Sequence, residues 1–264
     1  MSITLFPDQE YLVQEALALT NNATKHKNVL ITSPSGSGKT FIIAELIHRL
    51  IKLGFKQEEI LVISPTYEIS EQIYDRINLA LDTFKHNVLI LGSVLTSRLD
   101  DDEETKLPIK IIIVDEAHHA VSDTYTRVLE HFDQANVLGV TATPERSDMR
   151  KLGSLFQSLA YEYSIVQAIK EGYLCKIKAQ TVPLKIDMNN VSVTAGDFSA
   201  NEIGTALDPY LEQIATEMET VCKNRKTVVF LPLIATSQKF KNILINHGFK
   251  AAEVNGNSDD REQI

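Results

Sequence analysis

The chain has 264 residues, enough for one large domain or two of ordinary size, with 44% hydrophobic and 23% charged residues. Its net charge of −9 excludes binding to nucleic acid through bulk positive charge, so any such binding would use local backbone and hydroxyl contacts to phosphates. No apolar run approaches the roughly 20 residues of a membrane helix, and the first residues lack a signal-peptide pattern. These features predict a cytoplasmic protein.

The first part of the chain alternates segments with helical and strand-like patterns. Helical spacing of apolar residues predicts helices at residues 10–19, 41–53, 67–84 and 123–132. Continuous apolar runs predict strands at residues 28–32, 60–64, 87–91, 109–114 and 136–140. Strands that alternate with helices predict an α/β fold with a parallel sheet and right-handed crossovers.

The stretch between the first strand and the next helix reads Ser33-Pro34-Ser35-Gly36-Ser37-Gly38-Lys39-Thr40. This is the context of a phosphate-binding loop, although Ser33 replaces the first glycine of the G-x-x-x-x-G-K-[ST] pattern. The helix N-terminus offers unpaired backbone N–H groups, and glycine lets the backbone approach an anion closely. We therefore expect Lys39 to bind the β- and γ-phosphates of a nucleotide and Thr40 to bind Mg²⁺. The alternative is an ordinary turn with a surface lysine.

A pair of carboxylates, Asp115 and Glu116, follows the most apolar strand of the chain. Downstream of a phosphate loop, this is the position of a carboxylate that holds Mg²⁺, mostly through water. We expect Asp115 to hold the metal and Glu116 to orient or deprotonate an attacking water. The alternative is an acidic strand end that caps the next helix.

Polar motifs follow several strands of the predicted sheet, namely Ser33–Thr40, Pro65-Thr66, Asp115–His118 and Thr141–Thr143. In parallel α/β sheets, ligands bind beyond the carboxyl ends of the strands. We therefore expect these motifs to converge on one active site. Thr141 and Thr143 are candidates to link the metal site to a moving neighbour, or are simply β-branched residues that finish a strand.

The C-terminal part of the chain has a looser pattern. Strands are expected at residues 179–186, 227–231 and 251–254. Helices are expected at residues 201–223 and 235–247, after a polar loop at residues 187–198. Together they predict a second α/β unit that begins near Lys176.

These motifs, in this order, resemble those of superfamily 2 helicases and translocases of the DEAH/DExH kind, especially the branch of restriction-enzyme motor subunits and excision-repair helicases. Ser33–Thr40 resembles motif I, Asp115-Glu116-Ala117-His118 matches motif II letter for letter, and Thr141-Ala142-Thr143 matches motif III. The resemblance implies a P-loop NTPase with a RecA-like parallel sheet sandwiched by helices. Residues 1–165 would form the N-terminal ATP-binding lobe, and residues 166–264 a connector and an incomplete C-terminal RecA-like lobe.

The resemblance also implies roles for individual residues. Those implied in catalysis are Glu116, Asp115 and His118. Those implied in nucleotide binding are Gln9, as the reader of adenine, and Pro34, Ser35, Gly36, Ser37, Gly38, Lys39 and Thr40. The implied Mg²⁺ ligands are Thr40 and Asp115, and the residues implied to couple nucleotide state to lobe movement are Thr141 and Thr143.

Weaker matches extend the resemblance beyond the ATP site. The residues implied to contact nucleic acid are Pro65, Thr66 and Ser93, from motifs Ia and Ib. Glu171-Gly172-Tyr173-Leu174 resembles the family's connection between lobes, and residues 227–231 resemble motif IV. The arginine-bearing motifs V and VI do not occur before Ile264, so the chain resembles a motor truncated within its second lobe.

The resemblance implies an ATP-dependent motor that hydrolyses ATP with Mg²⁺ and acts on nucleic acid, DNA more than RNA. Additional subunits or a missing C-terminal segment would supply the absent motifs. Two alternatives stay open: a translocase that never separates strands, and a non-catalytic module that binds nucleotide or a partner. A small-molecule kinase would not predict the Thr-Ala-Thr segment or a second α/β lobe.

Overall fold

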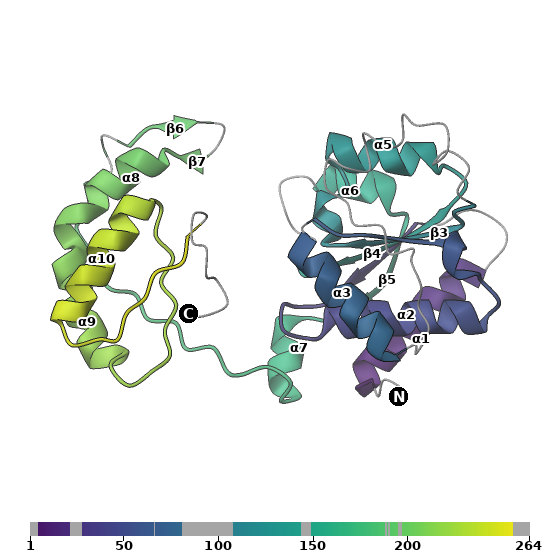
Figure 1. The fold of residues 1–264 in the computed structure, drawn as a ribbon, viewed down its shortest axis with the longest axis horizontal. Coiled ribbons are helices and arrows are strands. Elements are labelled where there is room, and N and C mark those ends of the chain that lie inside the picture. The colour runs from purple at the N-terminus through teal and green to yellow at the C-terminus, as the bar shows by residue number, and fades with distance from the viewer. Residues whose placement is uncertain are drawn as a thin grey trace. The chain divides into compact units, whose positions relative to one another are not determined.

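The computed structural model describes residues 5–21, 28–65, 67–80, 108–143, 149–187, 189, 191–194 and 197–255. The chain divides into two compact units, Met1–Lys176 and Ile177–Ile264 (Figure 1). The sequence predicts a connector after residue 165 and a second unit that begins near Lys176, and the compact units divide after Lys176. Among the described residues, no helix is both long and apolar enough to span a membrane.

The first unit is built on a parallel sheet with the strand order β2-β3-β4-β1-β5. Its strands are β1 (Val29–Thr32), β2 (Ile60–Ile63), β3 (Ile111–Asp115), β4 (Asn136–Thr141) and β5 (Ser158–Glu162). The register pairs Thr32 of β1 with Thr141 of β4, and Asp115 of β3 with Val140 of β4. The carboxyl ends of these three strands therefore lie level with one another, which brings the polar motifs that follow them to one edge.

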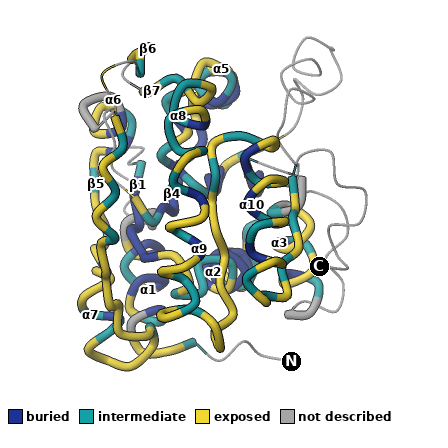
Figure 2. The backbone as a smooth tube through the Cα atoms, turned by 90° about the vertical axis from the view of Figure 1, so that its left-hand side faces the viewer, coloured by how far each residue is buried: buried dark blue, intermediate teal, exposed yellow. Residues whose placement is uncertain are grey.

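Helices cover both faces of this sheet, which confirms the predicted α/β class (Figure 1). One face carries α1 (Pro7–Asn21), α2 (Lys39–Lys52) and α3 (Tyr67–Ala80). The other carries α5 (Asp123–His131) and α6 (Met149–Leu155). Alternate residues of β1, β2, β3 and β4 enter the two cores, which explains why these strands read as continuous apolar runs. Figure 2 shows β1 and β4 among the buried segments.

Most elements predicted for the first unit are present. The predicted helices are confirmed as α1, α2, α5 and, as far as residue 80, α3. The predicted strands are confirmed as β1, β2, β3 and β4. The strand predicted at residues 87–91 lies outside the described residues. A short helix, α7 (Ile165–Lys170), follows β5 and precedes the segment that leads into the second unit.

An ion-pair network joins α1 to α2 and so fixes the helix that carries Gln9 beside the helix that follows the phosphate loop. Arg49 donates from Nη1 to Glu10 Oε1 at 2.7 Å, from Nη2 to the second Glu10 oxygen, and from Nε to Glu45 Oε1 at 2.8 Å. The hydrogen bond from Arg49 lowers the pKa of Glu10, and the same bond raises the pKa of Arg49. Bidentate guanidinium pairs of this kind are geometrically selective.

The second unit contains mainly helices. They are α8 (Ala200–Leu207), α9 (Leu211–Val221) and α10 (Ile234–Asn246), with a two-stranded antiparallel pair of β6 (Val193–Thr194) and β7 (Asp197–Phe198). A 3₁₀ turn at Asp208–Tyr210, with Pro209 near its start, divides the single helix predicted at residues 201–223. A small core forms from Leu211, Ala215, Phe240 and Leu244.

The three strands predicted for the second unit are wrong. Residues 179–186, 227–231 and 251–254 are described, but they form no strand. Phe230 is 91% exposed and Val228 is 78% exposed, so this apolar run is not covered. A strand requires a neighbour for its backbone N–H and C=O groups, and apolar composition alone does not supply one.

Candidate functional site

The phosphate-type loop between β1 and α2 has the backbone of an anion-binding loop. Gly36 and Gly38 adopt positive φ angles of 82° and 85°, which favour glycine. A Cβ atom on Gly38 would lie 2.8 Å from Nε2 of Gln9, so a larger residue would also meet that side chain. Gly38 is the N-cap residue of α2, and the backbone N–H groups at this helix start are suited to an anion.

Ser33, the departure from the usual loop pattern, is accommodated by hydrogen bonds. Its backbone N–H donates to the carbonyl of Thr141 at 2.9 Å, which joins the loop to the end of β4. Ser37 Oγ donates to the carbonyl of Pro34 at 2.6 Å, so Ser33 Oγ is the donor to Ser37 Oγ at 2.6 Å. Ser33 therefore stabilises the loop by one hydrogen bond to Ser37 within it and one to Thr141 at the end of β4.

The two main motifs meet at Lys39 and Glu116. Lys39 Nζ lies 3.5 Å from Glu116 Oε1. Glu116 has a left-handed backbone, with φ 49° and ψ 52°, an uncommon conformation for a residue with a side chain. Its backbone N–H donates to Asp115 Oδ1 at 2.9 Å. Strained backbone of this kind clusters at functional sites, so the geometry singles out this carboxylate.

Asp115 is nearly enclosed at the end of β3. Burial raises its pKa to about 6, and the negative charge of Glu116 adds to this effect. The hydrogen bond from the Glu116 backbone and the positive charge of Lys39 act in the opposite direction. A carboxylate that is costly to ionise without a partner is suited to binding a cation.

The third motif is joined to the second through Thr141. His118 Nδ1 lies 3.0 Å from Thr141 Oγ1 and 3.4 Å from Glu116 Oε2. The backbone N–H of Thr143 donates to the same Thr141 hydroxyl at 3.2 Å. Thr141 is fully buried, whereas Thr143 is exposed. The ends of β3 and β4 thus share one hydrogen-bond network.

Gln9 connects α1 to the phosphate loop. Its Oε1 accepts from the backbone N–H of Phe6 at 3.0 Å, and its Nε2 donates to the carbonyl of Ser37 at 2.8 Å. A primary amide has two hydrogens and two lone pairs on oxygen, so one donor and one acceptor position remain after these two bonds. Gln9 therefore has hydrogen-bonding capacity for a ligand.

A cavity of about 490 Å³ lies beside the loop. It is lined by Phe6, Gln9, Gly36, Ser37, Gly38, Phe41, Tyr163, Gly172 and Tyr173. Four aromatic side chains on separate elements thus surround the space next to Gln9. Sequence reasoning did not assign Phe41, Tyr163 or Tyr173 to the site, because no local pattern connects them.

The predicted nucleic-acid contacts are only partly described. Pro65 is half-buried just after β2, at the same edge of the sheet as the other motifs. Thr66 and Ser93 lie outside the described residues.

The oxygen donors expected for Mg²⁺ are Thr40 at the start of α2 and Asp115 at the end of β3. Within the described parts of the chain, no three His, Cys, Asp or Glu side chains cluster so as to hold a metal ion. Mg²⁺ is bound mostly by one or two carboxylates, water and substrate phosphates rather than by an all-protein cage. A hydroxyl and a carboxylate are hard oxygen donors, so this set fits Mg²⁺ delivered with a nucleotide.

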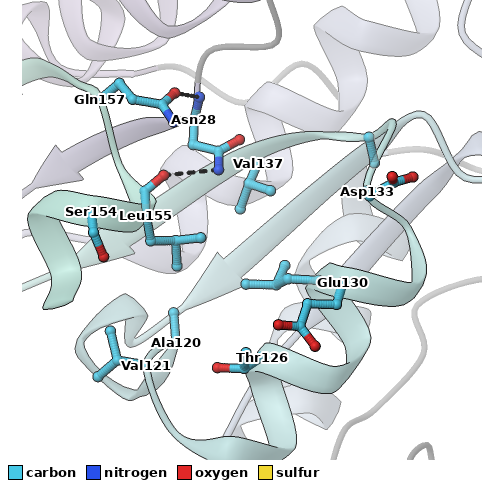
Figure 3. A pocket seen from close by; sticks show the side chains of 12 residues that line it. Asn28, Ala120, Val121, Thr126, Glu130, Asp133, Val137, Ser154, Leu155 and Gln157 are labelled. Carbon is cyan, nitrogen blue, oxygen red and sulfur yellow. Dashed lines mark hydrogen bonds between the residues drawn. The ribbon is translucent and has the colours of Figure 1, made fainter.

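A second cavity, of about 560 Å³, lies between α5 and α6 at the opposite ends of the strands (Figure 3). Asn28, just before β1, donates from Nδ2 to the carbonyl of Leu155 at 2.8 Å and from its backbone N–H to Gln157 Oε1 at 3.2 Å. Exposed Glu130 and Asp133 also line this cavity. It shares no residue with the site predicted from the sequence.

A parallel sheet with a glycine-bearing loop after β1 and an acidic pair at the end of β3 defines the P-loop NTPase class with a RecA-like sheet. Residues 2–146 match the family described as type III restriction enzyme, res subunit, and the chain belongs to this family.

Curated relatives and a solved structure agree with this assignment. "Putative ATP-dependent helicase IRC3" of Saccharomyces cerevisiae is 26% identical over 220 residues, which are 74% of this chain and 32% of that protein. The type I restriction enzyme EcoAI endonuclease subunit of Escherichia coli is 22% identical over 255 residues, 83% of this chain and 31% of that protein. The fragment structure of "a putative HsdR subunit of a type I restriction enzyme" from Vibrio vulnificus YJ016 superposes with a TM-score of 0.64. It is 21% identical and covers 91% of this chain and 45% of that one.

The resemblance to superfamily 2 helicases of the restriction-subunit branch is thereby confirmed. The chain spans about a third of the length of the two curated relatives.

Proposed function

We propose that this chain is the ATP-binding part of an ATP-dependent helicase or translocase that acts on nucleic acid, DNA more than RNA. The observation that carries the proposal is the 3.5 Å approach of Lys39 Nζ to Glu116 Oε1. These residues come from two motifs far apart in the sequence, and a nucleotide bound to one would react beside the other. The first lobe would span residues 1–165, with a connector and partial second lobe in residues 166–264, in the cytoplasm.

Phosphate binding would use the loop and its lysine. The backbone of Pro34, Ser35, Gly36, Ser37 and Gly38 would surround the phosphates, because the glycines permit close approach. Lys39 would exchange Glu116 for the β- and γ-phosphates.

The metal and water steps would use the residues at the end of β3. Mg²⁺ would be held by Thr40 and Asp115, and it would supply charge neutralisation for the phosphoryl group. The positive charge of Mg²⁺ would favour the ionised form of Asp115 and so offset the cost of burying this carboxylate. Glu116, released from Lys39 by the phosphates, would orient or deprotonate the attacking water.

Base recognition and coupling complete the proposal. Gln9 keeps one donor and one acceptor position, which match the ring nitrogen and amino group on one edge of adenine. A displacement of Glu116 would move His118 and, through the hydrogen bond between them, Thr141. Thr143, which donates to the Thr141 hydroxyl, would pass this displacement to a moving neighbour. Pro65, with Thr66 and Ser93, would contact the nucleic-acid backbone.

Two other functions have support. A translocase that never separates strands is favoured by the restriction-enzyme family of residues 2–146. A non-catalytic module that binds nucleotide or a partner is favoured by the absence of a parallel sheet from the described residues of the second unit.

Steady-state ATPase with single-stranded DNA, duplex DNA or RNA tests the proposal, with Lys39→Ala as the blank. We expect turnover that one of these polymers stimulates and that Lys39→Ala lacks. Strand-displacement and triplex-displacement assays then separate helicase from translocase. ATP binding without turnover above the blank, with every polymer, would favour the non-catalytic module.

A further inference from the structure

The segment that leads into the second unit takes part in the nucleotide cavity of the first. We call residues 171–174 the connector turn; it follows α7 and precedes the unit boundary after Lys176. Gly172 and Tyr173 of this turn line the 490 Å³ cavity. The Tyr173 ring packs on Phe6, with ring centroids 4.7 Å apart and an interplanar angle of 44°. Phe6 is 54% exposed and Tyr173 is 37% exposed, so part of each ring remains accessible to a ligand in the cavity.

The connector turn is held in place by its own hydrogen bonds. Tyr163 Oη donates to Glu171 Oε2 at 2.7 Å, and Tyr163 is itself buried and lines the cavity. Gln167 Nε2 donates to Glu171 Oε1 at 3.1 Å. The backbone N–H of Tyr173 donates to the carbonyl of Ala168 at 3.0 Å, which closes the end of α7. The Tyr173 ring is therefore presented to the cavity from a defined turn.

The connector turn also contacts the phosphate loop. A Cβ atom on Gly36 would lie 3.2 Å from Cδ2 of Leu174, so the side chain of Leu174 packs closely over this glycine. Gly36 and Tyr173 both line the same cavity. One short turn is thus in contact with the phosphate loop and with the space beside Gln9.

We propose that Tyr173 stacks on the nucleotide base, and that a purine bound against it stabilises the connector turn. This inference rests on the proposed ATP site. Aromatic side chains stack favourably on the faces of nucleic-acid bases, and a purine presents a larger face than a pyrimidine. Tyr163 acts as a positioning residue, because it holds the turn through its hydrogen bond to Glu171. Binding of the base, rather than binding of the phosphates, therefore stabilises the connector turn that leads to the second unit.

Calorimetric titration of the full chain with Mg²⁺ and either ATP or inorganic tripolyphosphate tests the stacking role. We expect Tyr173→Ala to weaken ATP binding about tenfold and to leave tripolyphosphate binding unchanged, whereas Tyr173→Phe keeps wild-type affinity. The control is Tyr11→Ala, since Tyr11 is 48% exposed on α1 and does not line the cavity. Hydrogen exchange of the peptide that covers residues 171–176 should slow with ATP and not with tripolyphosphate.

The results of these titrations distinguish a failure of the stacking role from a failure of the proposed ATP site. If Lys39→Ala abolishes ATP binding and Tyr173→Ala leaves it unchanged, the stacking role is overturned and the ATP site stands. Equal protection of residues 171–176 by ATP and tripolyphosphate would overturn the action of the base on the connector turn. If the wild-type chain binds no ATP, the inference and the proposed function both fail.

Discussion

Nδ1 of His118 lies 3.0 Å from Oγ1 of Thr141, so the turn after β3 and the end of β4 are joined by side chains as well as by the sheet. The Thr141 hydroxyl also accepts from the backbone N–H of Thr143 at 3.2 Å. His118 in turn lies 3.4 Å from Glu116. A displacement of the Glu116 carboxylate, which faces Lys39, is therefore linked through His118 and Thr141 to the segment that follows β4.

Replacing Thr141 with valine tests this route. The change keeps the shape of the buried side chain but removes the hydroxyl that His118 Nδ1 and the backbone N–H of Thr143 share, and a hydrogen bond of this kind contributes about 0.5–1.5 kcal/mol. We expect stimulation of ATP turnover by nucleic acid to fall about tenfold, while ATP affinity stays within about twofold. Thr126→Val is the matched control, because Thr126 is a half-buried residue of α5. Full stimulation in Thr141→Val would contradict a coupling role.

Replacing Glu116 with glutamine separates binding from chemistry. The amide keeps the size of the side chain but is a poor base, so turnover should fall at least about 100-fold. ATP should bind as tightly as before or more tightly, because Lys39 no longer pairs with a charged residue. Binding is measured by calorimetry and turnover by phosphate release. Equal loss of both would show that Glu116 maintains the site rather than acting on water.

Adding a methyl group at Gly139 tests the packing behind the site. A Cβ atom there would lie 2.5 Å from Cζ of Phe156 and 2.9 Å from Cβ of Ala117, which follows the acidic pair. We expect Gly139→Ala to lower the free energy of unfolding by about 1–3 kcal/mol, and Phe156→Leu to restore part of the loss. Gly153→Ala in α6 is the control, because nothing lies within 4 Å of its added Cβ. An equal effect at both glycines in urea unfolding would rule out this packing.

His247, the residue that follows α10, makes a pH-dependent contact with α9 in the second unit. Its Nε2 lies 3.0 Å from Glu212 Oε2 and its Nδ1 lies 2.5 Å from Glu219 Oε1. The hydrogen bonds to Glu212 and then Glu219 raise the pKa of His247. A raised histidine pKa contributes stability that is fully present below the unfolded value of about 6.5 and is lost as pH rises through the folded pKa.

We therefore expect His247→Gln to speed hydrogen exchange in α9 and α10 at pH 6 and to have little effect at pH 9. His131→Gln, at the exposed end of α5 in the first unit, is the control. A His247→Gln effect of the same size at both pH values would mean that shape, not charge, matters at this position.

Local sequence was sufficient for the parts of the site that lie within one strand–loop–helix unit. The spacing around Lys39 predicts the loop because positive φ at Gly36 and Gly38 and the start of α2 are properties of adjacent residues. The acidic pair could be predicted in the same way, since it follows a continuous apolar run. The left-handed backbone of Glu116 could not, because no glycine marks that position.

The sequence by itself determined the alternation of strands and helices in the first unit, the phosphate-type loop and the order of the motifs, because these follow from residue spacing along the chain. Only the tertiary structure decided which aromatic side chains surround Gln9, since Phe41, Tyr163 and Tyr173 come from elements brought together by the parallel sheet. It also decided that the apolar run at residues 227–231 is not a strand. Periodicity describes one segment, whereas a strand or a binding cavity requires the partner that another segment places beside it.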